Sequence, residues 1–142
     1  MLIRGALLLT LAVLLTINFT SGFALTEMER TAIDNPRLEN TLGTPIIDNI
    51  NVNQQIQISA DITNNQKKSQ NFVYLVQIKN EHGVGVSLGW FSGQLTPDQK
   101  LSPSLSWISD ESGEYTAEIF VWEGLRNHNA LSEYTTLQIS VS

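Results

Sequence analysis

The chain has 142 residues, of which 42% are hydrophobic and 15% are charged, as expected for one globular domain with a short export segment. Its formal net charge is −6, from 14 acidic and 8 basic residues, which disfavours binding to nucleic-acid phosphates. The absence of cysteine excludes disulfides, thiol catalysis, iron–sulfur clusters and cysteine-based zinc sites.

Residues 1–24 are predicted to be a hydrophobic signal or anchor helix. Arg4 precedes an apolar run at residues 6–17, and the small residues Gly22 and Ala24 fit a signal-peptidase site with cleavage after Ala24. The run is shorter than the about 20 apolar residues that a membrane-spanning helix needs. The sequence therefore favours a cleaved signal peptide, with an uncleaved anchor as the alternative.

A third interpretation of the N-terminus starts from Arg4 and Gly5, which are followed directly by apolar residues. This pattern resembles the class III leader of archaeal type IV pilins and archaellins, which is cut after the glycine. The resemblance implies a filament subunit whose apolar segment packs in a filament core. All three interpretations place the rest of the chain outside the cytoplasm, in the extracellular space or at the cell surface.

Residues 25–43 are predicted to form a tether. The few apolar residues, Met28, Ile33 and Leu38, show no sustained period among many charged residues. Asn35–Pro36 is expected to stop any helical turn that precedes it, because a residue before proline disfavours the helical conformation.

Residues 44–142 are predicted to be one β-sandwich domain, because short apolar runs with period two alternate with polar turns. Strands are expected at residues 46–52, 55–62, 72–78, 84–91, 101–108, 115–121 and 134–141. Residues 72–78 are apolar on both faces, which is typical of a central strand. Gly85 and Gly89 predict a bulge or bend, and Pro103 predicts an edge strand. No stretch between these strands has a helical period.

The segment at residues 110–117 resembles the immunoglobulin-like and fibronectin type III superfamily. In that superfamily a Gly-x-Tyr at the start of the sixth strand forms a tyrosine corner, and here Gly113 and Tyr115 match it. Antibody-type domains have a cysteine two residues later, where this chain has Ala117. The resemblance implies a cysteine-free, seven-stranded antiparallel sandwich in which Gly113 supplies the turn and Tyr115 the corner hydrogen bond.

Three further segments, at residues 72–78, 88–97 and 119–123, resemble a group of small exported β-sandwich proteins of ammonia-oxidising archaea. This resemblance concerns lineage and implies no functional residue.

The sequence contains no recognisable catalytic or cofactor motif. His82 and His128 lie in separate polar loops, without the spacing of a metal site. Asp110, Glu111 and Glu114 could supply oxygen ligands to calcium, but they lack the alternating spacing of a calcium loop and are typical of a solvated turn. We therefore expect no enzyme activity, no cofactor and no metal.

The large aromatic residues are the strongest candidates for a contact surface. They are Trp90, Phe91, Trp107, Phe120 and Trp122. On the alternation of residues 115–121, Phe120 and Trp122 point away from the core. Outward aromatic rings on a sheet predict a partner-binding patch or a glycan-stacking platform, and they can equally pack under loops or against the tether.

Together these observations predict an exported, non-enzymatic module for protein binding or structural support at the cell surface, with another envelope or surface protein as its partner. Trp90, Phe120 and Trp122 are the expected partner surface. A filament subunit and a glycan- or calcium-binding accessory domain are the alternatives. Contact with a membrane is expected only through an uncleaved N-terminal segment, and none with nucleic acid.

Overall fold

The computed structural model describes residues 24–142, and nearly all of its regular structure is β-strand. The elements are η1 (Glu27–Glu29), β1 (Thr31–Glu39), β2 (Ile56–Asn64), β3 (Gln70–Asn80), β4 (Gly85–Leu95), β5 (Lys100–Leu101), β6 (Ser104–Trp107), β7 (Gly113–Trp122) and β8 (Thr135–Val141). All but the last residue of the predicted export segment lie outside the described residues. Within the described part, no helix is long and apolar enough to span a bilayer.

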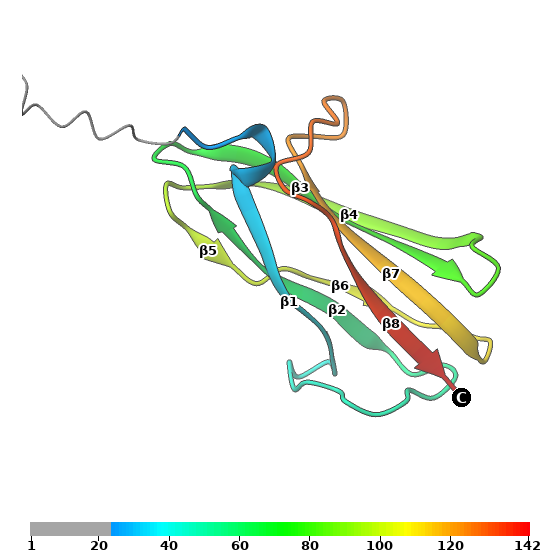
Figure 1. The fold of residues 1–142 in the computed structure, drawn as a ribbon. Coiled ribbons are helices and arrows are strands. Elements are labelled where there is room, and N and C mark those ends of the chain that lie inside the picture. Colours follow the sequence, from blue (N-terminus) through cyan, green and yellow to red (C-terminus); the bar gives the residue numbers. More distant parts are fainter. Residues whose placement is uncertain (1–23) are drawn as a thin grey trace, which may run out of the picture.

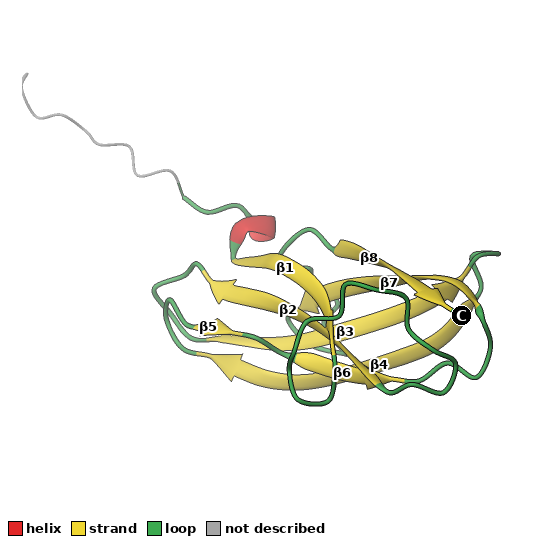
Figure 2. Cartoon of the chain, turned by 90° about the horizontal axis from the view of Figure 1, so that it is seen from below, coloured by secondary structure: helices red, strands yellow, loops and turns green. Residues whose placement is uncertain are grey.

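The strands form two antiparallel sheets packed face to face (Figures 1 and 2). Sheet A contains β1, β2 and, on the far side of β2, both β5 and β6. Sheet B has the order β4-β3-β7-β8. Because β5 and β6 pair with the same strand, they act as one interrupted strand, which gives the seven-stranded fibronectin-like arrangement. The predicted all-β, immunoglobulin-like sandwich is confirmed.

The core lies between the sheets and follows the alternation seen in the sequence. In β2 the inward residues Ile56, Ile58 and Ile62 are at most 1% exposed. Tyr74 of β3 is fully buried opposite them, and its hydroxyl donates to the Ile58 carbonyl at 3.3 Å. The packing of this apolar core stabilises the domain without any disulfide.

The prediction of a tether at residues 25–43 is wrong for the part that forms β1. β1 pairs antiparallel with β2 and is an edge strand of sheet A. Asn35, at φ +50°, and Pro36 form a bulge, because Asp34 and Arg37 are in register with β2 and the two residues between them are not. Proline is tolerated at an edge bulge, so the dipeptide bends the strand without ending it.

The predicted opening strand at residues 46–52 is not a strand. Pro45 forms an isolated bridge to Glu39 of sheet A, and Ile50 forms one to Val141 of sheet B. The segment therefore crosses from one sheet to the other and cannot pair along either. Ile50 is 1% exposed and belongs to the core, whereas Ile47 is 93% exposed.

Two predicted irregularities are present. The predicted edge strand at residues 101–108 is split at Pro103, which has no N–H to donate, into β5 and β6. Between β3 and β4, Ile78 is in register with Ser87 and Lys79 with Gly85, so one extra residue bulges from β4 beside Gly85.

Candidate ligand-binding surface

The predicted corner residues, Gly113 and Tyr115, lie at the start of β7, where their contacts stabilise the fold. The Tyr115 hydroxyl donates to the Glu111 carbonyl at 3.1 Å and lies 3.0 Å from the Ser109 hydroxyl. Its ring packs edge-on against Trp107, with centroids 5.0 Å apart. Gly113 has φ +154°, a conformation that side-chain-bearing residues rarely adopt. These contacts join the turn before β7 to the core.

The outer face of sheet B, which points away from sheet A, has an apolar end. The strand register places Trp90 of β4, Leu75 of β3 and Phe120 of β7 in one row across the sheet. The next row contains Val73 and Trp122. We call these five residues the aromatic face.

The aromatic face contains a second, smaller apolar layer outside the core. Leu75 and Val73 are only 5% and 2% exposed, yet neither belongs to the hydrophobic cluster between the sheets. Their cross-strand neighbours on this face are the rings of Trp90 and Phe120 for Leu75, and of Trp122 for Val73. Trp90 remains 49% exposed, so this layer is open on the β4 side.

The rings on β7 are packed against one another and are half-buried. Phe120 stacks on Tyr134 with ring centroids 5.1 Å apart and lies 5.5 Å from Trp122. Trp122 in turn lies 5.4 Å from His128. The predicted outward direction of Phe120 and Trp122 agrees with the strand alternation, but loop residues cover part of both rings. The exposed apolar area therefore extends to both sides of these rings, to Trp90 on β4 and to Tyr134 before β8, which are 49% and 52% exposed.

A groove with both polar and apolar lining residues continues from the aromatic face at the end where β3 begins. It consists of two adjoining pockets of about 480 and 720 Å³. Both are lined by Asn71, Gln94, Glu123 and Asn127. Val73, from the aromatic face, lines the larger pocket, so the groove and the aromatic face form one continuous surface.

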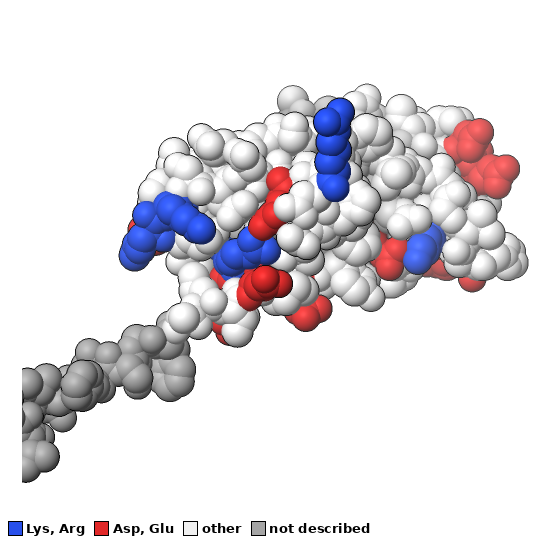
Figure 3. Space-filling view, turned by 90° about the horizontal axis from the view of Figure 1, so that it is seen from above, with Lys and Arg blue, Asp and Glu red and all other residues white. Residues whose placement is uncertain are grey.

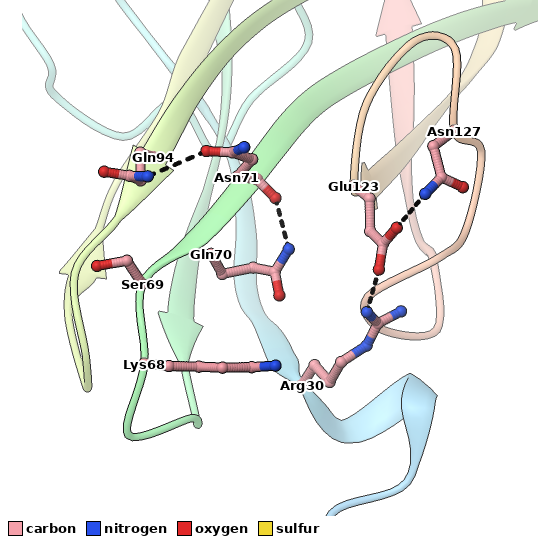
Figure 4. A pocket seen from close by; sticks show the side chains of 8 residues that line it. All are labelled: Arg30, Lys68, Ser69, Gln70, Asn71, Gln94, Glu123 and Asn127. Carbon is pink, nitrogen blue, oxygen red and sulfur yellow. Dashed lines mark hydrogen bonds and ion pairs between the residues drawn. The ribbon is translucent and has the colours of Figure 1, made fainter.

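Hydrogen bonds hold the side chains of this groove in place (Figure 4). Glu123 accepts from both Arg30 and Asn127, and Arg30 also donates to the Ala130 carbonyl at 3.2 Å. Gln94 donates to the Asn71 side chain at 3.2 Å. Amide groups of this kind can bind sugar hydroxyls or the peptide groups of another protein.

Two cationic side chains of the groove form no ion pair with another described residue. They are Lys68 and Arg126, which line the two pockets. Figure 3 shows that on the face drawn there several side chains of opposite charge lie against one another, with uncharged areas between these small groups. In an acidic chain, this groove is therefore a place where a ligand's carboxylate or phosphate would be attracted rather than repelled.

The structure does not bring the other candidate residues together. His82 is exposed in the β3–β4 turn, and His128 lies in the β7–β8 loop against Trp122. Within residues 24–142 no three His, Asp or Glu side chains are grouped so that they could hold a metal ion. Glu114 accepts a hydrogen bond from the Ser140 hydroxyl at 2.7 Å, and Asp110 and Glu111 are exposed.

Sequence reasoning missed the polar half of this surface. Asn71, Gln94 and Asn127 come from three separate elements, and no local motif connects them. One available signal was the apolar character of residues 72–78 on both faces, which required a cover over Val73 and Leu75.

Comparisons with known proteins show the fold alone. No known family's sequence profile matches the chain, and no curated protein matches it. The C-terminal domain of Wzt matches with a TM-score of 0.62 and 14% identity, over 80% of this chain and 74% of that one. The CARDB domain of the PF1109 protein from Pyrococcus furiosus was solved in complex with di-metal ions. It matches with a TM-score of 0.54 and 16% identity, over 83% of this chain and 97% of that one.

A third solved structure is the Pseudomonas fluorescens alkylpurine DNA glycosylase AlkC, bound to DNA containing an abasic site analog. It matches with a TM-score of 0.56 and 14% identity, over 79% of this chain and 30% of that one. Likeness to proteins with such different descriptions indicates a shared scaffold and transfers no activity. The chain is an immunoglobulin-like β-sandwich.

Proposed function

We propose that this chain is an exported, non-enzymatic binding module that acts at the cell surface and recognises an envelope protein through its aromatic face. The observation that carries the proposal is the apolar layer of Val73 and Leu75 beneath a half-exposed Trp90. Apolar residues clustered outside the core, with an aromatic ring open to solvent, are typical of protein-binding surfaces.

Binding to isolated cell envelopes of the producing organism tests this proposal. Trp90→Ala is expected to reduce co-sedimentation with the envelopes, because it removes the exposed ring of the aromatic face. Ile47→Ala is the matched control, since Ile47 is 93% exposed but lies on the segment that crosses between the sheets. Equal binding by the two variants would contradict a role for the aromatic face.

A glycan is the second candidate ligand, favoured by the amide side chains of the groove. Sugars bind by stacking on aromatic rings and by hydrogen bonds to amides, and both kinds of group adjoin here. Envelopes treated with protease or with periodate distinguish the two ligands. Loss of binding after protease supports a protein partner, whereas loss only after periodate supports a glycan and overturns the protein proposal.

Export is tested by sequencing the N-terminus of the protein found outside the cell. A start at Leu25 supports a cleaved signal peptide, and an intact N-terminus supports an anchor. A start at Ala6 would support the filament interpretation and contradict both of the others. Retention of the protein in the cytoplasm would overturn the proposed location.

A further inference from the structure

β4 is the free edge of sheet B. It pairs with β3 along its whole length, and no strand of the described part of the chain lies on its other side. About half of the backbone N–H and C=O groups of an edge strand point away from its only neighbour. β4 has 11 residues and is therefore a long row of open hydrogen-bonding groups.

The other sheet edges are covered or interrupted by the chain itself. At the β8 edge, Ile50 donates to the Ser140 carbonyl at 3.1 Å and accepts from the Ser142 N–H at 2.9 Å. The β1 edge contains Pro36 in a bulge. The β5–β6 edge is short and split at Pro103. Bulges, prolines and short strands are the usual features that prevent edge-to-edge pairing.

β4 has almost none of this protection. It contains no charged residue and no proline, and its bulge lies at one end, so residues 87–95 stay in unbroken register with β3. Gly89 and Gly93 lie on the side facing sheet A, where the Leu105 side chain and the Phe72 ring pack close to their main chain. Glycines in a strand often mark a place where another backbone approaches closely.

The outward side of β4 is apolar. Val86, Leu88 and Trp90 are 48%, 56% and 49% exposed. A strand added beside β4 would cover these side chains as well as the open backbone groups. Main-chain hydrogen bonds and apolar burial would then stabilise the same contact.

The charge distribution favours a second copy of this chain as the added strand. The described residues have a net charge of (8 − 1) − 14 = −7, because Arg4 lies outside them. Lys79 and Glu81 are the only Lys, Arg, Asp or Glu residues of the β3–β4 hairpin at residues 70–95, and their charges cancel. Two acidic copies can therefore approach through this neutral hairpin while their remaining charges stay apart and screened by salt.

We propose that β4 pairs antiparallel with β4 of a second copy, so that the two four-stranded B sheets join into one continuous sheet. Such a contact is isologous, because each copy presents the same strand to the other. The two aromatic faces then lie on the same side of the joined sheet. This pairing does not depend on the ligand of the proposed function.

Sedimentation equilibrium of the purified protein, in the N-terminal form that the cell produces, tests the pairing. A concentration-dependent dimer is expected. Leu88→Lys brings two like charges together beside the joined strands and should raise the dissociation constant at least about tenfold, which corresponds to ~1.4 kcal/mol. Ile47→Lys, at an equally apolar and more exposed position, should leave the dimer unchanged. A monomer at all concentrations, or equal effects of the two variants, would overturn the proposal.

Single cysteines give a second, geometric test, because the chain has no cysteine of its own. Leu88→Cys, Trp90→Cys and Ser92→Cys place a thiol at successive outward positions of β4. Antiparallel pairing about a two-fold axis predicts a maximum of disulfide-linked dimer at one position and a decline on either side. Cross-linking that is the same along the series and in Ile47→Cys would show random collision and contradict the pairing.

Discussion

Replacement of Tyr115 by phenylalanine isolates the hydrogen bonds of the corner. The ring and its packing on Trp107 are kept, whereas the hydroxyl's donation to the Glu111 carbonyl and its hydrogen bond with the Ser109 hydroxyl are lost. That carbonyl also accepts from Ser109, at 2.7 Å, so neither of these two groups is left without a partner. The expected loss is therefore close to the net value of a single hydrogen bond, about 1 kcal/mol.

The loss can be measured as a change in the free energy of unfolding by urea denaturation. For a domain of this size it corresponds to a fall in Tm of about 4 °C. Tyr134→Phe is the control, because Tyr134 is 52% exposed and no hydrogen bond from its hydroxyl is seen among the described residues. Equal stability of the two variants would refute the assignment of Tyr115 as a fold-stabilising residue.

Other predictions concern charge and packing. The hydrogen bonds from Ser102 and from the Arg37 guanidinium lower the pKa of Asp61 below its ordinary value. Asp61 therefore stabilises the fold at pH values above its unfolded pKa, and this stabilisation is lost as the pH falls through the lower folded pKa. In the variant Asp61→Asn, the free energy of unfolding should consequently fall less steeply as the solution is acidified. An equally steep fall in the variant would contradict this. A Cβ at Gly93 would lie 3.1 Å from the Phe72 ring, so Gly93→Ala should cost about 1–3 kcal/mol in urea denaturation. Gly124→Ala, with nothing within 4 Å of its Cβ, should be close to neutral, and equal costs would refute the packing argument.

The strand alternation in the sequence predicted most of the sandwich, because a half-buried strand needs one apolar face. It failed at β1, where Asn35–Pro36 has the local signature of a stop and is a bulge in an edge strand. It failed again at residues 46–52, where Ile46 and Ile50 indicate a strand but serve two different sheets. In both places long-range pairing decides the structure, and local periodicity does not report it.

The candidate surface was predicted only in part for a related reason. The direction of Phe120 and Trp122 follows from strand parity, which is local. The contact of Asn71 with Gln94 depends on the β3–β4 register, and the position of Asn127 depends on its loop lying against Arg30 and Glu123. Such contacts join residues far apart in the chain, and a sequence without a local motif gives no sign of them.

The positions of the two ends of the domain have a mechanical consequence. β1 starts at the end where Thr31 donates to the Leu131 carbonyl, and β8 finishes at the other, so the chain enters and leaves at opposite ends (Figure 1). Tension between these ends acts along the strands and strains the ladder between β1 and β2 in shear, so its hydrogen bonds must break together rather than one after another. We therefore expect the domain to resist mechanical extension and to have a low unfolding rate under tension.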